Sequence, residues 1–84
     1  MILDNLKYET IIGMCVVALT KHIMQKFNLS QEVAFAKLAT TKFYSLLENP
    51  DTGLCLEPDY YLFKCCDLEL DDKPDEMLAF IENN

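Results

Sequence analysis

The chain has 84 residues, of which 51% are hydrophobic, and this length and composition predict one helical domain over residues 1–84 with a modest core. They exclude a second domain and an intrinsically disordered chain. The net charge of −7 and the lack of any arginine disfavour binding to nucleic acid or to an anionic membrane surface.

The charge is unevenly distributed along the chain. Residues 1–47 hold five lysines and three acids, whereas residues 48–84 hold two lysines and eleven acids. The second part is therefore compatible with a basic partner protein. It is also compatible with acids that are simply solvated on helix surfaces and keep the protein soluble.

The first predicted element is a long amphipathic helix over residues 5–27. Its apolar residues follow helical spacing along one stripe: Tyr8, Ile12, Cys15, Val16, Leu19, Ile23 and Phe27. Asp4 or Asn5 can cap its start. Ile11, Met14 and Val17 widen the apolar surface beyond that stripe, so we expect this helix either to be central or to bury a second face in a homodimer.

A second helical stretch is predicted from Ser30, as its N-cap, to residue 48. Two adjacent β-branched residues, Thr40 and Thr41, lower helix propensity in its middle. The stretch therefore bends there or divides into two short helices.

Asn49 to Gly53 is the strongest break in the chain, because Pro50 cannot continue a helix and Gly53 suits a turn. Leu54-Cys55-Leu56 then predicts one short extended segment, in which Leu54 and Leu56 enter the core. Pro58 and Asp59 favour a helix start, and a helix over residues 60–70 follows. Pro74 starts a last short helix. The predicted fold class is thus all-α, a small bundle of three to five helices with one extended segment after the Pro-Gly turn.

The residues capable of chemistry do not form a known motif. The four cysteines are Cys15, Cys55, Cys65 and Cys66, and no pair has the spacing that lets neighbouring ligands converge on zinc. A four-ligand site including His22 is geometrically conceivable, but buried reduced thiols are the simpler interpretation. The acids in the first ten residues are unlike a signal peptide, and the predicted location is the cytoplasm.

Catalysis and cofactor binding are not predicted. His22, the single histidine, lies two helical turns from Cys15, about 10 Å along the axis and too far for a direct hydrogen bond. Counting a calcium loop from Asn49 places Gly53 and Leu54 where a ligand and a glycine are needed. We therefore expect a protein that is not an enzyme and that has no cofactor and no metal.

Several short motifs occur in order along residues 29–70: Leu29-Ser30, Ala34-Phe35, Phe43-Tyr44, Leu46-Leu47, Thr52-Gly53-Leu54 and Tyr60-Tyr61-Leu62. Their spacing resembles a group of short bacterial proteins of unknown function, some of them encoded near toxin–antitoxin genes. The resemblance implies a bacterial cytosolic helical protein with an antitoxin-like or complex-forming role. It carries over no catalytic residue.

The leading functional hypothesis is a small helical protein–protein interaction module that homodimerises through its first helix. The alternative is an acidic antitoxin-like inhibitor, or nucleic-acid mimic, that binds a basic partner protein. The candidate interaction residues are three apolar positions of the first helix and five acids of the second half: Ile11, Met14, Val17, Glu57, Asp59, Asp67, Asp71 and Asp72.

Overall fold

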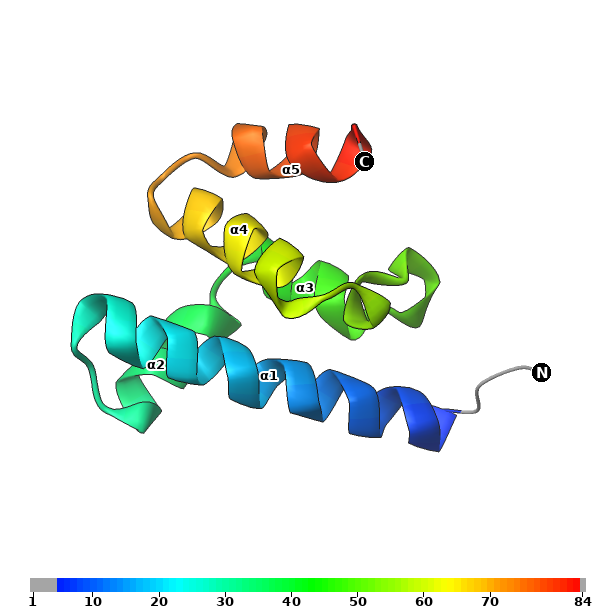
Figure 1. Cartoon of the computed structure of the whole chain (residues 1–84), viewed down its shortest axis with the longest axis horizontal. Coiled ribbons are helices and arrows are strands. Elements are labelled where there is room, and N and C mark those ends of the chain that lie inside the picture. Colours follow the sequence, from blue (N-terminus) through cyan, green and yellow to red (C-terminus); the bar gives the residue numbers. More distant parts are fainter. Residues whose placement is uncertain (1–4, 84) are drawn as a thin grey trace.

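The computed structural model describes residues 5–83, and every regular element in that range is helical (Figure 1). The five α-helices are α1 (Asn5–Phe27), α2 (Gln31–Ala39), α3 (Lys42–Glu48), α4 (Asp59–Leu70) and α5 (Pro74–Glu82). Two 3₁₀ turns, η1 (Pro50–Thr52) and η2 (Leu54–Leu56), join α3 to α4. The all-α prediction is confirmed.

The long helix α1 runs along one edge of the molecule, and α2 lies beside its C-terminal half (Figure 1). Helix α4 and the η2 turn pack on another side of α1, and α5 folds back along α4 on the far edge. As a result, α1 is covered on two sides by the rest of the chain and is open on its remaining side.

The apolar stripe predicted for α1 is the stripe that faces the core. Cys15, Leu19 and Ile23 are buried, and the other four members of the stripe are partly buried against the core. This agreement follows from the 3.6-residue period, which places these residues on one side of the helix. Asp4 and the side chain of Asn5, the predicted caps, lie outside the part that the structure describes.

The second helical stretch is divided at the two threonines. Helix α2 ends at Ala39, and α3 begins at Lys42 with Thr41 as its N-cap. The Thr41 hydroxyl accepts a hydrogen bond from the Tyr44 N–H at 3.0 Å and donates one to the Leu38 carbonyl at 2.7 Å. Ser30 caps α2 as predicted, accepting from the Val33 N–H at 3.4 Å.

The predicted extended segment at residues 54–56 is wrong. Gly53 adopts a left-handed conformation, with φ of 69°, and the next three residues form the η2 turn. An extended segment would direct Leu54 and Leu56 to the same side, but the tighter turn buries Leu54 at 4% exposure and leaves Leu56 57% exposed. Cys55 is buried in place of Leu56.

Candidate functional site

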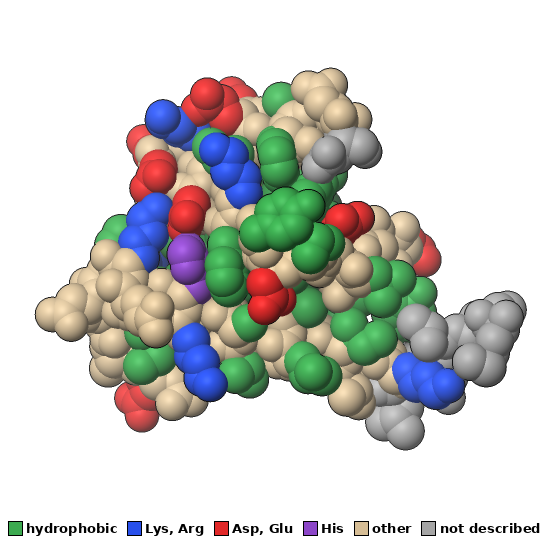
Figure 2. Space-filling model, viewed as in Figure 1, with side chains coloured by type: hydrophobic (Ala, Val, Ile, Leu, Met, Phe, Trp, Pro, Cys, Tyr) green, Lys and Arg blue, Asp and Glu red, His purple; other side chains and the backbone are tan. Residues whose placement is uncertain are grey.

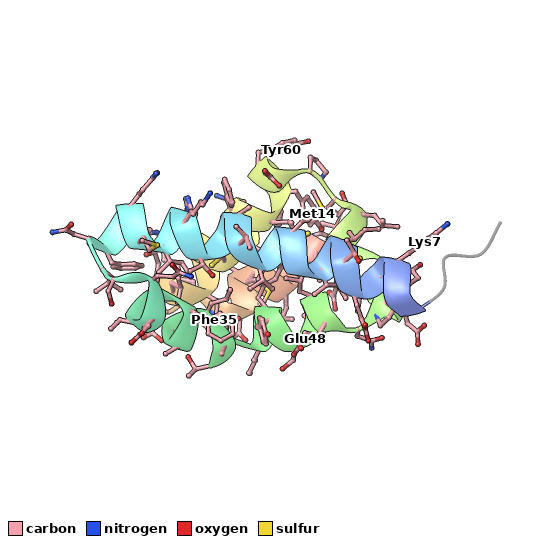
Figure 3. All side chains as sticks on the ribbon, turned by 90° about the horizontal axis from the view of Figure 1, so that it is seen from below. Lys7, Met14, Phe35, Glu48 and Tyr60 are labelled. Atoms are coloured by element: carbon pink, nitrogen blue, oxygen red, sulfur yellow. The ribbon has the colours of Figure 1, made fainter. Side chains whose placement is uncertain are left out.

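The outer face of α1 carries exposed apolar side chains. Met14 is 69% exposed and Val17 is 55% exposed, on the side of the helix opposite Leu19 and Ile23. Figure 3 looks onto this face, with Tyr60 at the start of α4 on one side of α1 and Phe35 of α2 on the other. Because Met14 and Val17 lie about one helical turn apart, they form one continuous exposed apolar surface.

A groove of about 500 Å³ runs along one flank of this face, between α1 and the η2–α4 connection. On this flank the Cys15 thiol of α1 donates a hydrogen bond to the Cys55 carbonyl of η2 at 3.4 Å. Most of the side chains that line the groove are apolar, and the charged ones are at its rim. The lining residues are Ile11, Met14, Cys15, Val17, Ala18, Lys21, Cys55, Glu57 and Asp59.

A second groove, of about 250 Å³, lies on the opposite flank, between α1 and α2. Its floor and walls combine apolar side chains of α1 with Phe35, which is 41% exposed. The lining residues are Val16, Val17, Thr20, Lys21, Met24, Gln31 and Phe35. Val17 and Lys21 line both grooves, so they form a ridge between two hollows, a shape that can interlock with another helix. We refer to Met14, Val17 and Lys21 as the α1 ridge.

The structure brings five of the eight candidate interaction residues together. Ile11, Met14, Val17, Glu57 and Asp59 all line the larger groove, although 40 residues of chain separate Val17 from Glu57. Sequence spacing alone does not pair the acidic segment with α1, because that pairing depends on how α4 packs.

The remaining three candidates lie elsewhere and have structural roles. Asp67 on α4 and Asp71, the residue that caps its C-terminus, pair with side chains of α1, and Asp72 then adopts a left-handed conformation with φ of 66°. Asp tolerates this conformation better than most residues, so Asp72 suits the turn into α5.

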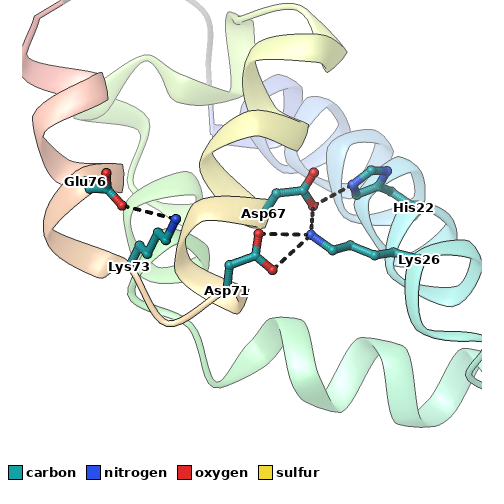
Figure 4. Close-up of polar contacts among 6 residues, drawn as sticks. All are labelled: His22, Lys26, Asp67, Asp71, Lys73 and Glu76. Carbon is teal, nitrogen blue, oxygen red and sulfur yellow. Dashed lines mark hydrogen bonds and ion pairs between the residues drawn. The ribbon is translucent and has the colours of Figure 1, made fainter.

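Two basic side chains of α1 hold the acidic end of α4 (Figure 4). His22 Nε2 lies 2.8 Å from Asp67 Oδ1, and the imidazole stacks on Phe63 with 4.3 Å between the ring centroids. Lys26 Nζ lies 3.3 Å from Asp67 Oδ1 and 3.2 Å from Asp71 Oδ1. The imidazole is visible at the surface in Figure 2, as purple atoms beside basic and acidic groups.

The electrostatics of this cluster favour charged Lys26. Partial burial alone lowers the pKa of Lys26, but the hydrogen bonds and negative charges of Asp71 and Asp67 outweigh burial and raise that pKa above its usual 10.5. Lys26 therefore supplies one positive charge that the carboxylates of Asp67 and Asp71 share.

The cysteines behave as apolar core groups. All four are free and buried, and burial raises the pKa of the Cys65 thiol to about 11 and that of the Cys66 thiol to about 12. Cys15 and Cys55, at the floor of the larger groove, also have raised pKa values because of burial. Few thiolates exist at neutral pH under these conditions, and the thiolate is the reactive form.

Residues 5–83 contain neither a metal-binding cluster nor a helix suited to cross a membrane. No three His, Cys, Asp or Glu side chains in this range are placed to hold a metal ion together. Of the helices described, none has both the length and the apolar character needed to cross a membrane.

Sequence reasoning missed Lys21 and Phe35 as members of the candidate surface. Lys21 lies four residues after Val17, which puts it on the same side of a helix and was a usable signal. Phe35 gave no such signal, because its position in the sequence does not distinguish an exposed apolar residue of α2 from a buried one. Comparison with known proteins adds no further residue, since the chain matches no family model, no curated protein and no solved structure.

Proposed function

We propose that this protein is a small interaction module whose α1 ridge binds a second copy of the chain to form a homodimer without catalytic activity. The observation that carries the proposal is the pair of apolar grooves on either side of exposed Met14 and Val17. In a symmetric dimer, the α1 ridges of the two copies can pack across each other, and the hollows beside the ridges then face each other, because both copies present the same surface.

The size of the protein supports self-association. A domain of 84 residues buries a small core and is only marginally stable alone. Covering Met14, Val17 and the groove floors adds apolar burial at about 25 cal/mol per Å². The proposal is consistent with the resemblance of residues 29–70, which implies a bacterial cytosolic protein with a complex-forming role.

The alternative proposal, an acidic inhibitor or nucleic-acid mimic, has fewer free acids to support it. Asp67 and Asp71 are paired with α1, and the Glu69 carboxylate accepts hydrogen bonds from the Lys42 and Phe43 N–H groups at 2.6 and 2.8 Å. A mimic needs a row of free acids, whereas these three acids already have partners within the chain.

The test is sedimentation equilibrium over a concentration series, comparing the wild type with Val17→Glu. We expect a concentration-dependent dimer that Val17→Glu weakens at least about tenfold, because a desolvated carboxylate in an apolar contact costs ~1.4 kcal/mol or more. Val33→Glu is the matched control, since Val33 is similarly exposed at 52% but lines neither groove. A wild type that stays monomeric at tens of micromolar would rule out the homodimer.

A further inference from the structure

The charges at the rim of the larger groove are not used within the chain. Lys21, Glu57 and Asp59 make no hydrogen bond or ion pair through their side chains with any residue of the described range 5–83. Other charged side chains nearby do pair, as Lys26 does with Asp67. The larger groove therefore presents both signs of charge beside an apolar floor, ready for a partner with the same arrangement.

The positive and the negative charges at the rim of the larger groove lie at different levels along the axis of α1. The Cys15 thiol donates a hydrogen bond to the Cys55 carbonyl at 3.4 Å, which places the chain just before Glu57 and Asp59 at the level of Cys15. Lys21 is six residues further along the helix, which is about 9 Å at 1.5 Å per residue. The acidic rim formed by Glu57 and Asp59 therefore lies about 9 Å toward the N-terminus of α1 from Lys21, on the same flank.

We propose that two copies pack their α1 helices antiparallel about a two-fold axis near Val17, so that Lys21 of each copy pairs with Glu57 and Asp59 of the other. This inference rests on the proposed homodimer and specifies its geometry. It adds a role for Lys21 in choosing orientation.

Symmetry selects the antiparallel arrangement. A two-fold axis perpendicular to α1 reverses the helix direction and keeps each flank of the helix on its own side. A residue four positions after Val17 in one copy therefore lies at the level of the residue four positions before Val17 in the other copy. Lys21 then lies at the level of Gly13 and Met14 of the second copy, beside that copy's acidic rim. A two-fold axis parallel to α1 would instead place the two Lys21 side chains at one level, where like charges repel.

The ion pairs determine orientation more than affinity. The Lys21 ammonium can reach the acidic rim while its methylene groups cover apolar side chains that line the groove, such as Ile11 and Met14. A pair at a solvent-exposed rim contributes modest energy, but juxtaposed like charges are penalised, and this difference discriminates between orientations.

A charge-swap experiment tests the pairing. We expect Lys21→Glu to weaken the homodimer about tenfold, because the new carboxylate faces Glu57 and Asp59, and we expect the double variant Glu57→Lys, Asp59→Lys to do the same. An equimolar mixture of the two proteins should form a heterodimer of about wild-type affinity, since both rim contacts are then complementary. Lys64→Glu, an exposed position of α4 outside the groove, is the matched control.

Disulfide cross-linking tests the orientation separately. Val17→Cys lies at the two-fold axis and should form an intermolecular disulfide in either orientation. If the helices are antiparallel, the two copies of Thr10→Cys lie about 21 Å apart along the helix axis and cannot form a disulfide, whereas in parallel helices they lie at one level. The four native thiols are buried, and the wild type, which retains them, is the control for any disulfide that they form.

The outcomes separate the two proposals. A protein that remains monomeric and does not cross-link at Val17→Cys contradicts the homodimer itself. Cross-linking at both Val17→Cys and Thr10→Cys, or a mixture of charge-swapped variants that fails to associate while the wild type dimerises, overturns the antiparallel pairing and leaves the homodimer standing. Cross-linking at Val17→Cys alone, together with a stable heterodimer, supports both.

Discussion

The carboxylate of Glu69, on α4, accepts a hydrogen bond from the backbone N–H of Phe43 at 2.8 Å and so caps α3 from another helix. Its second oxygen accepts from the Lys42 N–H at 2.6 Å, and Thr41 satisfies the Tyr44 N–H. Three of the N–H groups that lack a partner within a helix are thereby satisfied at the start of a helix of only seven residues. Helix α3 therefore depends on α4 for its start as well as for its packing.

Replacing Glu69 should consequently destabilise the fold. We expect Glu69→Ala to lower the free energy of unfolding by about 1–2 kcal/mol, and Glu69→Gln by less because an amide oxygen still accepts one hydrogen bond. Urea denaturation at neutral pH measures both values. Glu76→Ala is the control, since Glu76 has only a 3.8 Å contact to exposed Lys73, and an equal loss in Glu69→Ala and Glu76→Ala would contradict the capping role.

The contact between His22 and Asp67 should show measurable coupling. In a double-mutant cycle with His22→Ala and Asp67→Ala, we expect an interaction free energy of about 0.5–1 kcal/mol, because the 2.8 Å pair is only partly exposed. The same cycle on Lys73 and Glu76, whose side chains are 58% and 63% exposed, should give a value near zero. Indistinguishable coupling in the two cycles would mean that His22 and Asp67 contribute no more than a surface pair.

The η2 turn predicts opposite behaviour for two neighbouring leucines. Leu54→Ala should cost about 2–4 kcal/mol of unfolding free energy, since it empties a buried site, whereas Leu56→Ala should stay within about 0.5 kcal/mol. Chemical denaturation of the two variants makes a direct comparison, because the substitution is identical and only the burial differs. Equal losses would favour an extended segment that buries both leucines.

The buried thiols predict a loss of stability at alkaline pH. In the unfolded chain Cys65 and Cys66 ionise near the ordinary pKa of 9.0, but in the folded protein burial raises these pKa values to about 11 and about 12. The folded state thus binds the thiol protons more tightly, and the associated stability is complete below pH 9 and is lost as the pH rises toward 12.

The thiol contribution is isolated by comparing the wild type with Cys66→Ala. We expect the free energy of unfolding of the variant to fall less steeply between pH 9 and pH 11, with a slope difference of up to ~1.4 kcal/mol per pH unit. Tyr and Lys titrate in both proteins and cancel in the difference. Parallel pH profiles would show that Cys66 ionises similarly in the folded and unfolded states.

The local features of this fold were predictable because they depend on neighbours in the sequence. The helical period of α1, the Ser30 cap, the break at the two threonines and the stop at Pro50 each follow from residues within one or two turns. The extended segment predicted at residues 54–56 was wrong because three residues are too few to show a periodicity. The left-handed conformation of Gly53 starts a 3₁₀ turn there instead.

The sequence by itself determined the all-α class, most helix boundaries and the apolar excess on α1 that contains Met14 and Val17. Only the tertiary structure decided what the acids of the second half do, because a carboxylate takes its role from partners that the chain brings near it. Packing of α4 on α1 pairs Asp67 with His22 and Lys26, and the η2 turn sets Glu57 and Asp59 beside the ridge. Contacts across some forty residues depend on how helices pack, and sequence spacing does not encode that packing locally.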